Sequence, residues 1–239
     1  KKIKTVDRQA KLLIFNLSGG SSLLFHLKLT GRLLVRNPSD PLDNYTRSVF
    51  SLKRQSPKGE TFLVKARKIP DLNPPPSNVA GTFDVPSDPG SDRSGSKELR
   101  FCDSRMFGFV KLLSGEQLEG HRKKYGPDAL DLNLTPRKLL DNLQKKKTAV
   151  KKALLEQELV AGVGNIYAND SLWMAGIHPE TLTSELTQFQ AAALLGSLRE
   201  ILEESITHRG STLGDKMYID LYGREGTHQN HFRVFGKNG

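Results

Sequence analysis

The sequence of 239 residues has a single cysteine, Cys102, and no long apolar run. One thiol excludes an intrachain disulfide framework and any metal site that needs several thiolates from this chain, and it fits a reducing, cytoplasmic compartment. No segment approaches the roughly 18 to 20 apolar residues that cross a bilayer, and the opening "KKIKTVDRQAK" lacks the apolar core of a signal peptide. We therefore expect no membrane partner.

Acidic residues are too few to balance the basic ones. The chain has 26 Asp and Glu against 36 Lys and Arg, which gives a net charge of +10 and a sequence pI near 9.7. Such a surplus favours a polyanionic partner, and nucleic acid is the first candidate. The alternative is a basic surface that is merely solvated.

The first third of the chain has the pattern of β-strands. Apolar runs predict strands over 12–17, 21–29, 32–36 and 47–54, and Ser18-Gly19-Gly20 predicts a hairpin turn. A further strand is predicted over 98–113, with a charged interruption at its middle. Between them, residues 70–96 are rich in Pro, Ser, Gly and Asp, so we expect a long, mobile surface insertion between two paired strands.

From about Gly126 the hydrophobic period becomes helical. Thr135 is expected to cap a helix with Pro136 at its first position, and further helices are expected over 148–158, from Asn165, and over 184–207. The last of these carries an apolar stripe that we assign to the core: Leu194, Leu195, Leu198, Ile201 and Leu202. The tail "HQNHFRVFGKNG" predicts the start of another hairpin.

A glycine turn joins two of these helices in "LVAGVGNIYANDSLWMAGIHP", residues 159–179. Unpaired N–H groups at the start of the second helix, together with its dipole, would form an anion site at Gly162, Gly164 and Asn165. Nearby lysines, among them Lys147 and Lys151, make a phosphodiester the expected anion. The alternative is a tight helix–helix corner whose glycines only permit close packing.

Four ordered stretches resemble the formamidopyrimidine-DNA glycosylase family: "DRQAKLLIFNL" (7–17), "FHLKLTGRLLV" (25–35), "FCDSRMFGFVKL" (101–112) and the helix-two-turn-helix segment at 145–179. The resemblance implies an α+β fold. It places a partial N-terminal β-sandwich domain at 1–113, a linker at 114–125 and a helical helix-two-turn-helix domain at 126–239. It also implies that duplex DNA containing oxidised purines or abasic sites is the partner of a monomeric protein.

Two family features are absent from this sequence. Family members begin with Pro-Glu, whose proline amine attacks the sugar C1′, and they usually end with a four-cysteine zinc finger. We therefore expect a fragment truncated at both ends, in which the nucleophile is not assignable and no metal site is present, although zinc is expected in the intact family member.

The resemblance assigns roles to individual residues. Lys11 matches a lysine that contacts the backbone at the lesion and assists the chemistry, and His26 matches a phosphate-contacting histidine. A wedge that fills the space of the extruded base would consist of Leu29, at a position commonly Met, with Arg105 and Phe107. Taken without the resemblance, Phe107 would be a core aromatic residue and Arg105 a surface ion pair with Asp103.

Two further segments depart from the family pattern. Phe235 stands where the family has a tyrosine, which removes a hydroxyl able to bind phosphate. Residues 210–229 match the loop that covers the flipped base, but Gly214 and Lys216 leave its contacts open.

The expected activity is therefore that of a base excision repair glycosylase with AP lyase activity, which removes 8-oxoguanine or formamidopyrimidines. The alternatives are a non-catalytic binder of damaged DNA, a helix-two-turn-helix module outside repair such as a ribosomal-type protein, and a sister family that favours oxidised pyrimidines. The combination of Leu29, Arg105 and Phe107 favours repair, since a binder of intact duplex needs no wedge.

Overall fold

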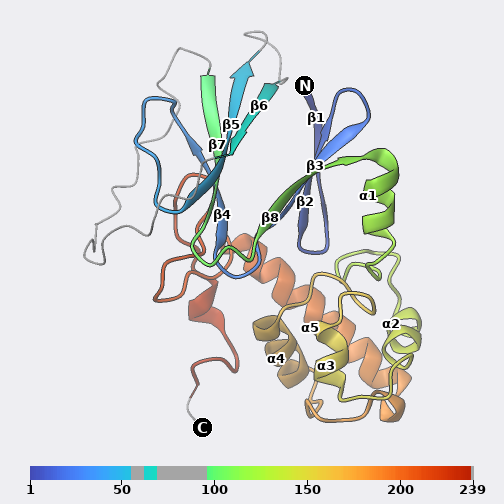
Figure 1. Ribbon diagram of the computed structural model, residues 1–239. Coiled ribbons are helices and arrows are strands. Elements are labelled where there is room, and N and C mark those ends of the chain that lie inside the picture. Colours follow the sequence, from blue (N-terminus) through green and yellow to red (C-terminus); the bar gives the residue numbers. More distant parts are fainter. Residues whose placement is uncertain (55–61, 69–95, 238–239) are drawn as a thin grey trace. The chain divides into compact units, whose positions relative to one another are not determined.

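The computed structural model describes residues 1–54, 62–68 and 96–237, and the chain divides into two compact units of an α+β fold (Figure 1). The sheet unit consists of Lys1–Asp7, Leu12–Gly115 and Thr212–Gly226, and the helical unit consists of Arg8–Lys11, Glu116–Ser211 and Thr227–Gly239. The predicted mobile insertion at 70–96 lies outside the described residues, apart from Ser96.

The sheet unit contains two four-stranded sheets, with strand orders β1-β2-β3-β8 and β4-β7-β5-β6. In the first sheet, β3 pairs antiparallel with β2 and with β8, and in the second, β7 pairs antiparallel with β4 and with β5. The strands are β1 (Ile3–Gln9), β2 (Leu12–Leu17), β3 (Ser21–His26), β4 (Gly31–Arg36), β5 (Thr46–Arg54), β6 (Phe62–Lys68), β7 (Ser96–Asp103) and β8 (Phe109–Ser114).

The two sheets share one hydrophobic core, which makes this unit a β-sandwich. Phe25 of the first sheet is fully buried and makes edge-on ring contacts with Phe50 and Phe101 of the second, at centroid distances of 5.4 and 6.3 Å. Burial of such aromatic side chains contributes on the order of 2 to 3 kcal/mol each.

The prediction of a single strand over 98–113 is wrong. It divides into β7 and β8, which belong to different sheets, and the charged interruption between them is the loop that crosses from one sheet to the other. The structure also contains β1 and β6, neither of which the sequence pattern predicted, and β3 ends at His26, three residues before the predicted end.

The helical unit contains five α-helices among its described residues: α1 (Gly115–Arg122), α2 (Pro136–Leu143), α3 (Val150–Leu155), α4 (Asn165–Met174) and α5 (Gln188–Thr207). The predicted cap is confirmed, because Thr135 Oγ1 accepts a hydrogen bond from the backbone N–H of Lys138 and Pro136 begins α2. The start of α4 at Asn165 is also confirmed. The helix α1 lies in the segment expected to be a linker.

The apolar face of α5 lies in the core of this unit, as its periodicity predicts. Leu194, Leu195, Leu198 and Ile201 are buried, and Leu202 packs against the same cluster. The predicted hairpin at the tail is wrong, because His228–His231 form a short 3-10 helix, η3. Within the described ranges, no helix is long and apolar enough to cross a membrane.

Candidate nucleic-acid interface

The turn between α3 and α4 gives its two glycines different backbone conformations. Gly162 has φ +96°, which L side chains rarely adopt, whereas Gly164 has φ −113° and ψ 172°, an extended conformation open to any residue. The side chain of Gln157 braces the turn, since its Oε1 accepts from the N–H of Gly162 and its Nε2 donates to the carbonyl of Val163, both at 3.0 Å. Gly162 is therefore needed for the backbone path, but Gly164 is not.

The N-terminus of α4 faces outward from this turn. Its N-cap residue is Gly164, which has no side chain and makes no side-chain cap hydrogen bond to the first helical turn. Asn165, the first helical residue, is exposed. Uncapped N–H groups and the positive end of the helix dipole together form a site suited to an anion.

Lys11 lies at the same turn, although it is far away in sequence. A methyl group placed on Gly164 would lie 3.6 Å from the Nζ of Lys11. The Lys11 side chain is exposed, and the residues Arg8–Lys11 belong to the helical unit although Arg8 and Gln9 end β1 and Leu12 begins β2. The structure thus brings together Lys11, Gly164 and Asn165, all three of which were predicted as site residues.

Asp128 holds the segment that carries Lys11. Its carboxylate accepts two hydrogen bonds from the guanidinium of Arg8, at 2.6 and 3.0 Å, and one from the backbone N–H of Ala10 at 3.2 Å. The same carboxylate accepts from the N–H of Leu130 at 3.0 Å. A bidentate, charge-assisted pair fixes orientation as well as distance, so Asp128 positions the chain one residue before Lys11.

The environment of Asp128 favours its charged form. Burial by itself raises the pKa of this carboxyl, but the hydrogen bonds from Arg8, Leu130 and Ala10 outweigh burial, and the pKa lies below its ordinary value of 3.8. The side chain of Asp128 is 18% exposed and that of Arg8 is 48% exposed, so solvent weakens their attraction. The carboxylate is therefore ionised at neutral pH and keeps Arg8 engaged.

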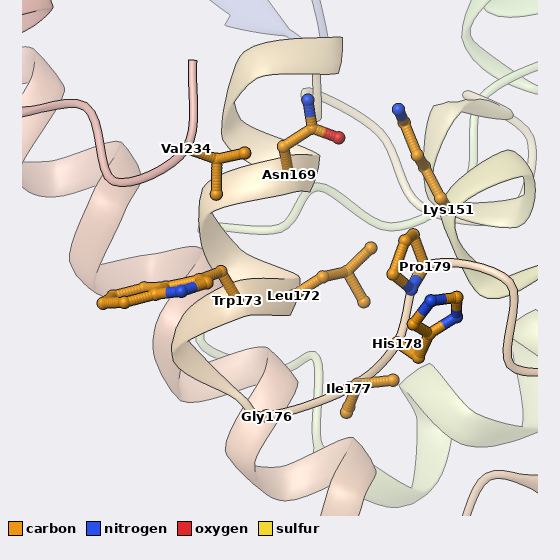
Figure 2. Close-up of a pocket in the computed structure, with 9 residues that line it drawn as sticks. All are labelled: Lys151, Asn169, Leu172, Trp173, Gly176, Ile177, His178, Pro179 and Val234. Carbon is orange, nitrogen blue, oxygen red and sulfur yellow. The ribbon is translucent and has the colours of Figure 1, made fainter. Parts of the chain in front are cut away.

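The lysines near the turn do not all have the same surroundings. Lys147 is exposed, whereas the Nζ of Lys146 is bound to the carboxylate of Glu156. Lys151 lines a hollow of about 570 Å³ beside α4. Figure 2 shows its amine end on the same side of this hollow as the amide of Asn169, while Leu172 and Ile177 form part of its apolar lining. Asn169 lies one helical turn after Asn165 and hence on the same face of α4.

In the sheet unit, the β3–β4 and β7–β8 loops each expose large apolar side chains. Leu29 lies between β3 and β4 and is 70% exposed, while Met106 and Phe107 lie between β7 and β8 and are 63% and 55% exposed. The guanidinium of Arg105 lies over the ring of Phe107, with 5.1 Å from Cζ to the ring centroid. Phe107 is thus no core residue, which excludes the alternative drawn from the sequence alone.

A buried carboxylate ties these two loops together. Asp103 is 1% exposed and accepts hydrogen bonds from the hydroxyl of Thr30 and from the backbone N–H groups of Arg105, at 3.3 Å, and Gly108, at 2.7 Å. Asp103 therefore contacts the backbone of Arg105 rather than its guanidinium. This network holds Leu29, next to Thr30, and Phe107, next to Gly108, in one fixed arrangement.

His26, Phe235 and the loop at 210–229 were also predicted to contribute to the site. His26 ends β3, and its Nδ1 accepts from the N–H of Lys28 at 3.0 Å, which places the proton of the neutral ring on Nε2. Phe235, at 46% exposure, packs edge-on against Phe232 in the helical unit. In the loop at 210–229, the backbone carbonyl of Leu221 accepts a hydrogen bond from the backbone N–H of Val35, and both residues belong to the sheet unit.

Sequence reasoning missed Asp103, Asp128 and Gln157, which position the predicted residues. Asp103 and Asp128 lack any periodic signal, and each has one partner far away in sequence, Thr30 for Asp103 and Arg8 for Asp128. A weak signal existed for Gln157, a polar side chain within a glycine-containing turn, where amides commonly bond to the backbone.

Comparison with known proteins matches both parts of the chain. Residues 1–72 match the family model of the formamidopyrimidine-DNA glycosylase N-terminal domain, and residues 125–217 match the model of the formamidopyrimidine-DNA glycosylase H2TH domain. A formamidopyrimidine-DNA glycosylase of Chloroflexus aurantiacus is 34% identical over 239 residues, which cover 100% of this chain and 70% of that protein. One from Moorella thermoacetica is 32% identical, with 99% of this chain and 72% of that protein covered.

Solved structures agree with these relatives. The Lactococcus lactis Fpg in complex with DNA containing an abasic site superposes with a TM-score of 0.71 at 27% identity, covering 99% of this chain and 72% of that one. Its complex with DNA containing Fapy-dG gives a TM-score of 0.70 at 27% identity, with 99% and 71% covered. On the matched domains and these relatives, the chain belongs to the formamidopyrimidine-DNA glycosylase family.

Proposed function

We propose that this chain acts in base excision repair as a DNA glycosylase with AP lyase activity, and that it removes oxidised purines such as 8-oxoguanine and formamidopyrimidines from duplex DNA. The observation that carries the proposal is the exposed pair Leu29 and Phe107, held with Arg105 by the buried carboxylate of Asp103. Exposed apolar side chains on braced loops are costly in water unless a partner covers them. An opened base stack is such a partner.

The wedge supplies what extrusion of a base requires. Flipping a nucleotide out of the duplex costs a few kcal/mol of stacking and pairing, and an inserted apolar side chain offsets part of that cost. Leu29 and Phe107 have this character, and the guanidinium of Arg105 can donate to the acceptor atoms of the base left without a partner. Leu29 has a volume close to that of methionine but is stiffer, so it makes a less adaptable plug.

The glycine turn supplies the phosphate site. A phosphodiester oxygen at the start of α4 would accept from the uncapped N–H groups of the first turn and from the side chain of Asn165, and Lys11 would add an ammonium at the same point. In this proposal Lys147 and Lys151 contribute further positive charge along the strand, and His26 donates from Nε2 to a phosphate. Lys11 also stabilises the negative charge that develops during base release.

Zinc is expected in the intact family member, in a finger of four cysteines. A finger of the family type needs four thiolates, and the chain has one cysteine, Cys102, which is fully buried in β7. The residues of this chain therefore do not fit a four-cysteine zinc finger. The single reduced cysteine fits an enzyme that works as a monomer at the nucleoid of the cytoplasm.

Trapping with borohydride tests the proposal. The chain is incubated with a duplex containing 8-oxoguanine opposite cytosine, and with a matched undamaged duplex, in the presence of borohydride. A glycosylase that uses an amine forms a Schiff base at C1′ of the sugar as the base leaves, and reduction fixes the protein to the strand. We expect a covalent complex on the damaged duplex alone, and strand cleavage when the reductant is omitted.

Two results would point elsewhere. Selective binding of the damaged duplex without trapping or cleavage would make the chain a non-catalytic binder of damaged DNA. Equal binding of both duplexes would show that Leu29, Arg105 and Phe107 do not act as a wedge. If trapping occurs, Lys11→Gln tests whether Lys11 is the attacking amine: persistence of the covalent complex assigns the attack to another amine, and its loss assigns the attack to Lys11 only if the variant still binds the damaged duplex and releases the base.

A further inference from the structure

A cluster of histidines lies in the helical unit, where the end of α5 meets η3. His208 caps the C-terminus of α5, and His228 and His231 begin and end η3. These are three of the six histidines in the chain, and the carboxylate of Glu204 lies beside them.

The donor atoms lie at distances that suit a shared metal ion. One ligand atom from each of Glu204, His208 and His228 falls within 4.8 Å of the others. The Nδ1 atoms of His208 and His228 are 3.4 Å apart, which is long for a hydrogen bond. Two nitrogens bound tetrahedrally to zinc at about 2.0 to 2.1 Å are separated by about 3.3 to 3.4 Å.

The backbone holds these side chains in place from two sides. Glu204 and His208 are four residues apart at the end of α5 and so share one helical face. His228 and His231 are three residues apart in a 3-10 helix, where such residues eclipse each other. The two elements are joined by the hydrogen bond from Thr227 N–H to the carbonyl of His208, at 2.9 Å.

His228 is buried and has one ring nitrogen without a partner. The residue is 1% exposed, and its Nε2 has no hydrogen-bond partner in the described part of the chain. A buried polar atom without a partner is costly, so an imidazole placed here for packing alone would be a poor choice. A cation would bind His228 through one ring nitrogen: through Nδ1, which lies beside Nδ1 of His208, or through Nε2, which is otherwise unpartnered.

Glu204 is the carboxylate of the cluster, and it has other partners. Glu204 Oε1 lies 3.5 Å from Nδ1 of His231, and Oε2 is bound to the guanidinium of Arg233 at 2.9 Å. Arg233 opposes a second cation, but it engages only one carboxylate oxygen. The ring of His231 stacks on that of His208 with centroids 3.9 Å apart.

We propose that Glu204, His208 and His228 bind a divalent transition metal ion, with Zn²⁺ as the best match, and that solvent completes its coordination. Two imidazoles and one carboxylate favour Zn²⁺ or Co²⁺ over the hard cations Mg²⁺ and Ca²⁺. The ion would fasten η3 to the end of α5. This donor set contains no thiolate, so it differs from the zinc finger of the family.

Metal binding to the full chain, prepared without a histidine tag and treated with EDTA, tests the proposal. We expect one Zn²⁺ per chain by equilibrium dialysis, a visible Co²⁺ spectrum of tetrahedral intensity that Zn²⁺ abolishes, and no competition by Mg²⁺. Zn²⁺ should also raise the melting temperature, since it binds the folded state. His208→Gln should weaken Zn²⁺ binding by at least about tenfold, as expected for loss of one ligand.

The matched control is His178→Gln, which removes an exposed histidine outside the cluster and should leave Zn²⁺ binding unchanged. His228→Gln, whose side chain is close to histidine in volume, and Glu204→Gln give independent variants if His208→Gln does not fold by circular dichroism. The proposal is overturned if the parent chain binds no stoichiometric Zn²⁺, or if the folded cluster variants bind it as tightly as His178→Gln does.

Discussion

The two glycines of the α3–α4 turn allow its two interpretations to be separated by experiment. At Gly162, with φ +96°, alanine must adopt a conformation that costs about 1 to 2 kcal/mol or more, against a gain of about 0.4 to 1 kcal/mol from a less flexible unfolded chain. We therefore expect Gly162→Ala to lower the free energy of unfolding by about 1 kcal/mol.

At Gly164 the balance is different. Its extended backbone accepts alanine without strain, and the added methyl would meet only the Nζ of Lys11, at 3.6 Å. The poorer helix cap and the stiffer unfolded chain nearly cancel, so the free energy of unfolding should change by less than about 0.5 kcal/mol. The methyl nevertheless occupies the space between Lys11 and the start of α4, where a phosphate oxygen would approach.

We expect Gly164→Ala to weaken binding of a duplex containing an abasic-site analogue by about tenfold, or about 1.4 kcal/mol. Urea unfolding measures stability and fluorescence anisotropy measures binding, with all variants at one salt concentration because phosphate contacts are salt-dependent. Gly162→Ala serves as the control for instability. If Gly164→Ala binds this duplex like the parent chain, the turn is a packing corner and the phosphate site is refuted.

Three further outcomes are expected. Phe107→Ala should reduce the preference for abasic over intact duplex by about tenfold with little loss of stability, whereas Phe189→Ala, at a ring that is even more exposed, should not; equal effects would refute the wedge. Asp128→Asn should cost about 1 kcal/mol at neutral pH, since the partner Arg8 is half exposed. Because the folded pKa lies below 3.8, this stabilisation exists above that pH and disappears as pH falls through the folded value, which melting curves across acid pH would follow. Cys102, whose pKa burial raises, should react with Ellman's reagent only on unfolding, so rapid reaction in native buffer would contradict its place in the core.

Local signals in the sequence predicted the elements whose cause is local. Thr135 and Pro136 fix the start of α2 through contacts within one helical turn, and the same holds for α4 at Asn165. The strands 12–17 and 32–36 follow from alternation and burial, which act on neighbouring residues. The division of 98–113 could not be predicted in this way, because the carboxylate of Asp103, the last residue of β7, accepts a hydrogen bond from the hydroxyl of Thr30, 73 residues away in sequence.

The candidate site depends even more on distant pairs. Lys11 reaches the glycine turn because Arg8 is bound to Asp128, a contact that spans 120 residues and has no counterpart in hydrophobic period or composition. The histidine cluster has the same origin: the tail was predicted as a hairpin, and only the observed η3 brings His228 to His208.

The net charge of +10 predicts a polyanionic partner but does not say where that partner binds. Lys146 illustrates the reason, because its ammonium is already paired with the carboxylate of Glu156. A carboxylate, Asp128, rather than another cation, sets the position of Lys11 beside Gly164. An acidic residue can therefore increase the affinity for DNA, because the charge that it places is worth more than the repulsion that it adds across solvent. Loss of Asp128 should accordingly weaken DNA binding, although it makes the chain more positive.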